Sequence, residues 1–191
     1  MYLSRVKLEP WNRKAAAALD NPWVMHGIVK CALSGSKDHP LWRVDELEGN
    51  RYLLLMSSEK PDKDVLTSQL SSEGGVFTKD YGAFLNRIDM GQRYFFRLAG
   101  NPVKRSKESG RIVPLAKMSE KRPGYRTEEG WIEERGSACG FRTEYMKITA
   151  RGTKHFFKKE HTTGKKRAVT IHCVTYEGIL EVTDNRSFTR H

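Results

Sequence analysis

Several features that mark other protein classes are absent from this sequence of 191 residues. No run of about 18 apolar residues occurs, so nothing in the sequence predicts a membrane-spanning helix or a membrane partner. The first eight residues alternate as in a strand and lack the apolar core of a signal peptide, so we expect no leader. The three cysteines are far apart without a CxxC pair, which is typical of reduced thiols in a cytoplasmic protein.

Motifs of several enzyme classes are also missing. The sequence contains no phosphate-binding glycine loop, no dinucleotide-binding GxGxxG and no nucleophile elbow. No HExxH spacing or carboxylate pair accompanies the histidines, and no histidine stands at finger spacing from a cysteine. We therefore expect neither a metal site nor a cofactor.

What the sequence does contain is aromatic residues and positive charge. Only 38% of residues are apolar, but four Trp, eight Phe and seven Tyr exclude a disordered basic tail. The net charge of +11 lies wholly after residue 90, because residues 1–90 hold 12 basic and 12 acidic residues and residues 91–191 hold 22 and 11. This asymmetry favours a polyanionic partner, most often nucleic acid, over a basic surface without a specific partner.

Both halves mix strands and helices. The elements predicted in the first half are a strand over 2–8, a helix over 21–33, strands over 41–46 and 51–57 joined by a turn at Gly49-Asn50, a helix over 64–70, and turns over 71–90. Those of the second half are strands over 92–98 and 112–115, a helix from Thr127 to Gly136, and strands over 141–149, 168–174 and 174–182. The pattern predicts an α+β protein of two small split βαβ units, with domains of residues 1–90 and 91–191.

The helix over 21–33 carries the most informative pattern. Asn21 at the cap followed by Pro22 is a standard start signal. One stripe of the helix is apolar and suited to the core: Met25, Ile28, Val29 and Ala32. The opposite side gathers an aromatic ring, an imidazole and an ammonium group, which belong to Trp23, His26 and Lys30, with Gly27 leaving space beside them.

These three side chains are candidate catalytic residues. An imidazole titrates near neutrality and can move a proton, a nearby ammonium group favours its neutral form, and an aromatic ring can stack on a base. Together His26, Lys30 and Trp23 would suit cleavage of RNA by its own 2′-hydroxyl, which needs no metal. The alternative is a solvated helix face. A Cys31–His26 nucleophile pair is disfavoured because the two residues lie about 140° apart around the helix.

Two basic segments of the second half are candidate RNA-binding surfaces. The first contains Lys104, Arg105, Lys107 and Arg111. The second, expected to be a hairpin with Thr162-Thr163-Gly164 at its tip, contains Arg151, Lys154, Lys158, Lys159, Lys165, Lys166 and Arg167. A basic two-stranded ribbon can follow phosphates or enter a groove, although composition does not distinguish RNA from DNA and a solvated, flexible hairpin is the alternative. The aromatic run at 94–96 is interpreted as core.

Four segments in the same order resemble a known family. They are Met1-Tyr2-Leu3-Ser4-Arg5, Asn21-Pro22-Trp23-Val24-Met25-His26, Phe96-Arg97-Leu98-Ala99-Gly100-Asn101-Pro102-Val103-Lys104 and Tyr176-Glu177-Gly178-Ile179-Leu180-Glu181-Val182. They are similar to the opening strand, catalytic helix, NP-lysine motif and late strand of the CRISPR repeat-processing endoribonucleases of type I-E systems, the CasE family. Each segment is weakly specific by itself, and the four together are specific.

The resemblance implies both a fold and a reaction. It implies two tandem ferredoxin-like (RRM-like) domains and a metal-independent endoribonuclease that cuts precursor CRISPR RNA in its repeat stem-loop. The 2′-hydroxyl would attack the phosphate, giving a cyclic phosphate and a 5′-hydroxyl. His26 matches the catalytic histidine of the family, as base or acid. The basic hairpin would grip the stem, and the enzyme would stay bound to its product beside other Cascade subunits.

The sequence departs from the family at two points. Some relatives carry tyrosine where this chain has Trp23, and indole donates one N–H but does no acid–base work, so more of the reaction would depend on His26 and Lys30. No glycine follows Gly178, so the C-terminal glycine-rich element is missing and the completeness of the second domain stays open. A non-catalytic RNA hairpin-binding subunit and a basic DNA-binding protein remain as alternatives.

Overall fold

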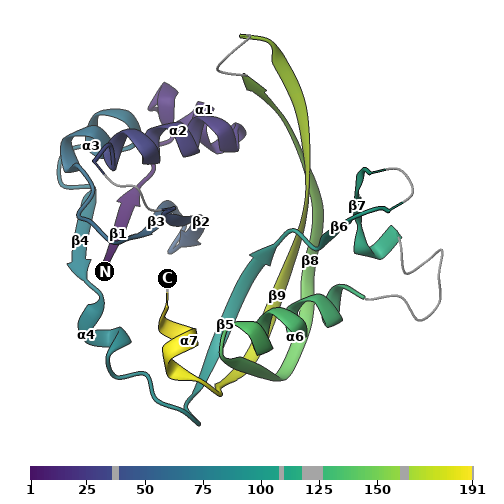
Figure 1. The fold of residues 1–191 in the computed structure, drawn as a ribbon. Helices are drawn as coiled ribbons and strands as arrows, with labels where there is room; N and C mark the ends of the chain where they lie inside the picture. Colours follow the sequence, from purple (N-terminus) through teal and green to yellow (C-terminus); the bar gives the residue numbers. More distant parts are fainter. Residues whose placement is uncertain (36–38, 108–109, 118–126, 160–163, 191) are drawn as a thin grey trace. The chain divides into compact units, whose positions relative to one another are not determined.

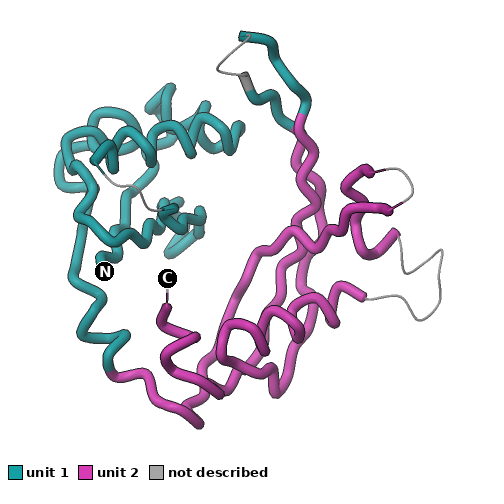
Figure 2. The backbone as a smooth tube through the Cα atoms, viewed as in Figure 1, with its two compact units in different colours: residues 1–86, 156–168 teal, residues 87–155, 169–191 magenta. Residues whose placement is uncertain are grey.

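A computed structural model describes residues 1–35, 39–107, 110–117, 127–159 and 164–190. The chain forms two compact units (Figure 2). Unit 1 comprises residues 1–86 and 156–168, and unit 2 comprises residues 87–155 and 169–191. The outer part of one long hairpin is therefore grouped with unit 1, although its sequence lies in the second half of the chain.

Unit 1 contains a four-stranded antiparallel sheet in the order β2-β3-β1-β4, with its longer helices on one face (Figure 1). In chain order its elements are β1 (Tyr2–Lys7), α1 (Arg13–Asp20), α2 (Pro22–Ala32), β2 (Leu41–Leu47), β3 (Asn50–Ser57), α3 (Lys63–Leu70), β4 (Val76–Asp80) and α4 (Gly82–Leu85). This is the ferredoxin-like arrangement, in which the first and third strands are central.

The core of unit 1 lies between the sheet and the helices. Alternate residues of β3, Leu53 and Leu55, are completely buried, as a half-buried strand requires. They pack with the apolar stripe of α2, whose buried residues are Met25, Ile28, Val29 and Ala32. That stripe is confirmed as predicted. The larger of these side chains, Met25, Ile28 and Val29, each contribute about 1.5–3 kcal/mol by leaving water, which fixes α2 on the sheet.

Three elements of unit 1 were not predicted: α1, β4 and the short helix α4, the last two lying where the sequence predicted turns. Helix α1 is capped by Asn12, whose side chain accepts hydrogen bonds from the backbone N–H groups of Lys14 and Ala15. Its alanines favour helix, and Ala15 and Ala18, three positions apart, are buried, so its cap and its periodicity were signals that the prediction overlooked. Strand β4 is short and depends on pairing with β1, 70 or more positions earlier.

The hairpin between β2 and β3 turns one residue earlier than predicted. Glu48 and Gly49 both have positive φ angles, 51° and 72°, which is the signature of a type I′ turn. Asn50 is then the first residue of β3 rather than part of the turn. The shift leaves the strand pairing intact, with Leu47 opposite Asn50.

Unit 2 combines a main sheet of three strands with a small two-stranded sheet and helices. Its elements are β5 (Arg93–Gly100), β6 (Val103–Arg105), β7 (Ile112–Pro114), α6 (Glu128–Ala138), β8 (Phe141–Lys159), β9 (Lys166–Val182) and α7 (Asn185–Thr189), the outer ends of β8 and β9 being grouped with unit 1. The main sheet has the order β5-β9-β8, and β6 and β7 pair separately. The predicted class, α+β with two tandem ferredoxin-like units, is confirmed.

Helix α6 does not end at Gly136 as the sequence predicted, but continues to Ala138. A side chain at position 136 would lie 2.8 Å from the backbone oxygen of Phe141, so this glycine allows the helix to approach β8 closely. On the same helix, Glu128 accepts a hydrogen bond of 3.1 Å at its backbone oxygen from the hydroxyl of Tyr176, which is completely buried. Burial raises the pKa of the Tyr176 phenol far above its usual value.

The aromatic run of β5 is divided between two faces. Phe96 packs against the core of unit 2, as predicted, whereas Phe95 is 72% exposed on the other face of the sheet. The alternation of a strand separates neighbouring side chains in this way. The interpretation of the run as core holds for Phe96 and not for Phe95.

Strand β9 depends on a glycine where β8 comes very close. A side chain at Gly178 would overlap the backbone carbonyl of Tyr145 and would lie 2.8 Å from the Cα atom of Met146. Nearby, the inward side chains of β8 change phase, from Thr143 to Met146. This slip in alternation is what an extra residue in one strand produces.

Strands β8 and β9 are longer than predicted and form one antiparallel ribbon (Figure 1). The separate strands predicted over 168–174 and 174–182 are continuous. Of the expected tip, Thr162 and Thr163 lie outside the described residues, and Gly164 has a positive φ of 67°. Among the helices that the structure describes, none combines the length and apolar character needed to cross a membrane.

Candidate active site on helix α2

Helix α2 presents the candidate catalytic side chains from a well-defined start. The Asn21 side chain accepts a hydrogen bond of 2.9 Å from the backbone N–H of Trp23, and Pro22 occupies the first turn. Met25 and Val29 are completely buried, which fixes the rotation of the helix about its axis. Trp23 and His26 are therefore held half-exposed on the flank away from the core, with Lys30 exposed one turn later.

The Trp23 and His26 rings lie one above the other. Their centroids are 6.0 Å apart and their planes differ by 29°. The ammonium group of Lys158, from the outer part of the ribbon that belongs to unit 1, lies 4.6 Å from the centroid of the Trp23 ring. This is a cation–π contact, which places a second positive charge beside the aromatic ring.

The surroundings of His26 favour its neutral form. Burial is the largest cause that lowers the pKa of His26 below 6.5, and the positive charges of Lys30 and Lys158 lower it further, followed by His39. Each of these penalises the imidazolium ion. At neutral pH the ring can therefore accept a proton, and two ammonium groups are at hand for a negatively charged reactant.

Gly27 leaves open space beside His26. No heavy atom would lie within 4 Å of a side chain at this position, and the backbone angle there is an ordinary helical one. The structure therefore gives no packing reason for glycine, which costs an exposed helix about 1 kcal/mol relative to alanine. The absence of a side chain leaves the surface next to the imidazole accessible.

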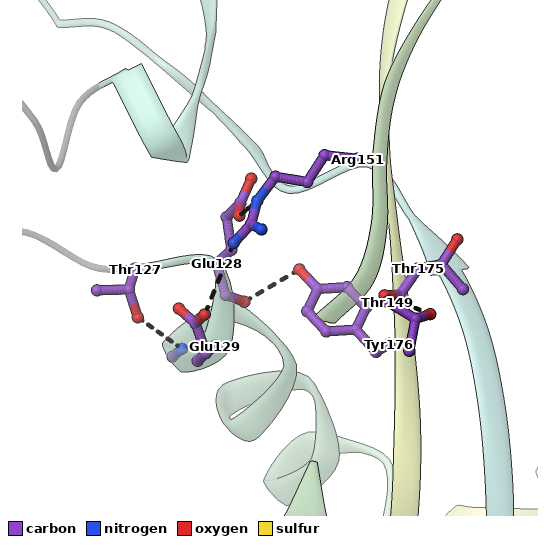
Figure 3. Close-up of polar contacts among 8 residues, drawn as sticks. Thr127, Glu128, Glu129, Thr149, Arg151, Thr175 and Tyr176 are labelled. Atoms are coloured by element: carbon purple, nitrogen blue, oxygen red, sulfur yellow. Dashed lines mark hydrogen bonds and ion pairs between the residues drawn. The ribbon is translucent and has the colours of Figure 1, made fainter. Parts of the chain in front are cut away.

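The cationic residues predicted to bind RNA in the ribbon differ in their surroundings. Four of them are exposed along the described strands: Lys154, Lys158, Lys166 and Arg167. Lys165 is exposed just before β9, and the backbone of Lys159 forms the end of β8. Arg151 instead forms an ion pair with Glu128, over 2.8 Å, and a longer one with Glu129, over 4.0 Å (Figure 3). Much of the charge of Arg151 is thus neutralised within unit 2.

The other basic segment folds back on itself in unit 2. Lys104 and Arg105 lie on β6, and Lys107 and Arg111 follow in the connection to β7, all four exposed. Arg105 donates a hydrogen bond of 3.0 Å to the backbone oxygen of Gly110, and the backbone N–H of Ser106 donates to the oxygen of Arg111 over 2.8 Å. These bonds close the loop and hold its cations on one small hairpin.

The structure adds two groups to the catalytic cluster that the sequence did not connect with it. The sequence placed Lys158 in a phosphate-binding hairpin, and His39 in no site. Both act on His26 through their charge, and Lys158 also contacts Trp23. No sequence signal could have joined residues so far apart, because helix periodicity relates only neighbours within a few turns. Among the described residues no group of three or more His, Cys, Asp or Glu could hold a metal ion.

Comparison with known proteins yields consistent matches over nearly the whole chain. The family model described as CRISPR associated protein matches residues 1–191. The CRISPR-associated endoribonuclease Cse3 of Thermus thermophilus is 29% identical over 196 residues, covering 96% of this chain and 87% of the relative.

Solved structures give the same result. The structure of CRISPR endoribonuclease Cse3 bound to 19 nt RNA matches with a TM-score of 0.74 at 26% identity, covering 98% of this chain and 89% of the other. A Thermus thermophilus Cse3 structure bound to an RNA representing a pre-cleavage complex matches at 27% identity with the same TM-score, over 98% and 87%. Cas6e from Escherichia coli, at 19% identity and a TM-score of 0.57 over 98% and 87%, shares the fold.

Proposed function

This chain belongs to the CRISPR-associated protein family, whose model matches it from end to end, and we propose that it is an endoribonuclease that processes precursor CRISPR RNA. The relationship to Cse3 at 29% identity over most of both chains supports this activity. The RNA-bound Cse3 structures support RNA as the substrate. Its substrate would be the repeat stem-loop, and its further partners the other subunits of a Cascade complex.

The reaction we propose needs no metal. The 2′-hydroxyl upstream of the cut gives its proton to the neutral His26 imidazole, and its oxygen attacks the adjacent phosphorus. The bond from phosphorus to the 5′-oxygen of the next nucleotide breaks, and that oxygen takes up a proton. The products are a 2′,3′-cyclic phosphate and a 5′-hydroxyl. Lys30 stabilises the extra negative charge of the transition state.

The remaining members of the cluster position the RNA. Trp23 offers a ring on which a base next to the cut can stack, and Lys158 over that ring adds a charge for a phosphate. In the proposed division of the chain, the predicted domain 1–90 cuts the RNA and the predicted domain 91–191 grips its stem. The residues proposed for the grip are the exposed cations of the ribbon and of the β6–β7 hairpin.

One observation carries the proposal: a half-exposed histidine kept neutral by burial and by two ammonium groups, one of which comes from the basic ribbon. On a helix face that is only solvated, nothing would favour the neutral form of the imidazole. A general base for a 2′-hydroxyl must be unprotonated at working pH and must lie beside positive charge for the phosphate.

The test is single-turnover cleavage of a repeat stem-loop by wild type and His26→Ala. We expect the rate constant to fall by about 10²–10⁴-fold, the usual loss for a general base, while the dissociation constant of the RNA changes little. A 2′-deoxy nucleotide at the attacking position should block cleavage by the wild type, and EDTA should not. Cleavage that requires magnesium, or an unchanged rate for His26→Ala, would disprove the mechanism.

One observation favours a second function. The ring at position 23 is an indole, which cannot exchange protons, so the chain has fewer acid–base groups beside His26 than relatives with tyrosine. A subunit that only binds the RNA hairpin would then retain binding without cleavage. The single-turnover assay with Trp23→Tyr separates the two functions, because an enzyme that lacks only the phenol should gain rate.

A further inference from the structure

Two histidines of unit 2 have no part in the proposed reaction, and each is paired with a threonine of the opposite strand. The Nδ1 atom of His155 on β8 lies 3.0 Å from the hydroxyl of Thr170 on β9. The Nδ1 atom of His172 on β9 lies 3.4 Å from the hydroxyl of Thr153 on β8. The same kind of pair therefore occurs twice, with the strands exchanged.

The contacts place all four side chains on one face of the ribbon. Thr153 and His155 are two apart on β8, Thr170 and His172 are two apart on β9, and residues two apart on a strand point to the same side, so the two cross-strand contacts join one face. His155 and His172 therefore lie on the same face of adjacent strands, one on each strand, where diagonal neighbours are about 7–8 Å apart. The opposite face at this level bears Lys154 and Ile171. The imidazoles thus form a small cluster on a defined surface rather than two isolated side chains.

The charged groups around this cluster are two cations, Lys117 and Arg151, and two carboxylates, Glu128 and Glu129. His172 and Thr153 line a pocket of about 350 Å³ with three charged residues: Lys117, Arg151 and Glu128. Glu128 is held by Arg151, which also reaches Glu129 (Figure 3). Both acids contact Arg151, and Lys117 is the second cation that lines this pocket.

We propose that His155 and His172, oriented by Thr170 and Thr153, form a phosphate-binding site for the RNA backbone. This site rests on the proposed function. It assigns phosphate contacts to a further face of the ribbon and to two histidines that are not among the Lys and Arg residues predicted from the sequence to bind RNA. The ligand is an RNA phosphodiester outside the cut.

The threonine partners suit this role. A hydroxyl that donates to Nδ1 leaves the ring proton on Nε2, where it can be donated to a phosphate oxygen. A carboxylate partner would instead satisfy the imidazolium charge within the protein. Because a hydroxyl is neutral, protonation of the ring next to a phosphate gains an ion pair that the protein itself does not supply. RNA binding at this site should therefore take up protons.

The test measures RNA affinity as a function of pH. The probe is a repeat stem-loop with a 2′-deoxy nucleotide at the cut, so that no cleavage occurs, at constant ionic strength between about pH 5.5 and 8.0, the range in which imidazoles titrate. We expect wild-type affinity to rise by about tenfold or more as pH falls through this range. The His155→Gln/His172→Gln variant should lose most of this rise and should differ from wild type by less than about threefold at the alkaline end.

Two further variants make the outcome decisive. His26→Gln keeps both ribbon histidines and should keep the pH dependence of binding, whereas Thr153→Val/Thr170→Val should reduce it, because the rings lose their orientation. A double glutamine variant that binds RNA with the full wild-type pH dependence would overturn the inference. If wild-type protein neither bound nor cleaved the stem-loop at any pH, the proposed function itself would fail. Thermal melts of each variant exclude a folding defect as the cause.

Discussion

Lys30 is the residue whose role can be separated most cleanly from folding, because it is exposed and acts on His26 through its charge. The pKa of His26 is lowered by burial and by Lys30, so the imidazole loses its proton below the ordinary value of 6.5. If neutral His26 is the base, the cleavage rate rises with pH through this lowered pKa and levels off above about 6.5. The pH at which the cleavage rate rises therefore depends on the charges around the imidazole.

Replacing Lys30 with Gln should move this profile. With one cause of the depression removed, the pKa of His26 rises, and the midpoint of the rate profile shifts to higher pH. The plateau rate should also fall, because Lys30 stabilises the transition state. Single-turnover rates between about pH 5 and 8 measure both effects, with Lys63→Gln on α3 as a control of equal charge change. An unshifted midpoint in Lys30→Gln would contradict the assignment.

For individual residues, the sequence predicted only the part of the site that lies on a single helix. His26 and Lys30 share a face at a spacing that periodicity fixes, and the structure holds them there. Lys158 reaches Trp23 only through the pairing of two long strands, which a single sequence does not specify. The neutralisation of Arg151 by Glu128 was invisible for the same reason, since 23 positions separate them.

Among whole elements, capping signals accompanied the three predicted helices, although α1, capped by Asn12, and α7, capped by Asp184, were not predicted. Asn21, Asp62 and Thr127 each accept a backbone hydrogen bond at a helix start, and all three helices were expected. Strand β4 was missed because its stability comes from β1 rather than from its own five residues. Gly136 misled the prediction of the end of α6, because a glycine that allows close packing looks the same in sequence as one that ends a helix.

Gly178 provides a prediction about an element. A Cβ atom there would overlap the β8 backbone, which cannot move without breaking the pairing of β8 with β9. We expect Gly178→Ala to lower the free energy of unfolding by about 2–4 kcal/mol, measured by denaturant titration.

Gly152 is the matched control for that substitution. It also lies on the ribbon, but no atom would come within 4 Å of its added methyl group. Gly152→Ala should leave stability unchanged or raise it by up to about 1 kcal/mol. Equal effects of the two substitutions would show that strand propensity, and not the contact with Tyr145, explains the glycine at 178.

For the whole molecule, the charge is distributed differently from what a division at residue 90 indicates. Unit 1 holds 16 Lys and Arg against 12 Asp and Glu, because residues 156–168 bring five basic residues and one acidic residue to it. Unit 2 holds 18 against 11. The unit with the candidate catalytic helix is therefore itself basic, because it includes the outer part of the ribbon.

This distribution predicts different salt responses for binding and for chemistry. Contacts to phosphates release counterions, so RNA affinity should fall steeply and linearly on a log–log plot between about 50 and 200 mM salt. The cleavage rate of RNA already bound, measured at saturating protein, should change by less than about threefold, since proton transfer at His26 releases no counterions. A bound-state rate that fell in parallel with affinity would indicate that salt disrupts the catalytic cluster itself.

The contact between Lys158 and Trp23 also bears on when the enzyme becomes active. The two residues are 135 positions apart, and Lys158 is held in place by the pairing of β8 with β9, whose last residue is Val182. Helix α2 and its sheet can form as soon as the first 80 residues have left the ribosome. The second ammonium group can reach the indole only after almost the entire chain has been synthesised. We therefore expect a nascent chain to carry a folded catalytic helix without the Lys158 contact, and full activity to require the pairing of β8 with β9.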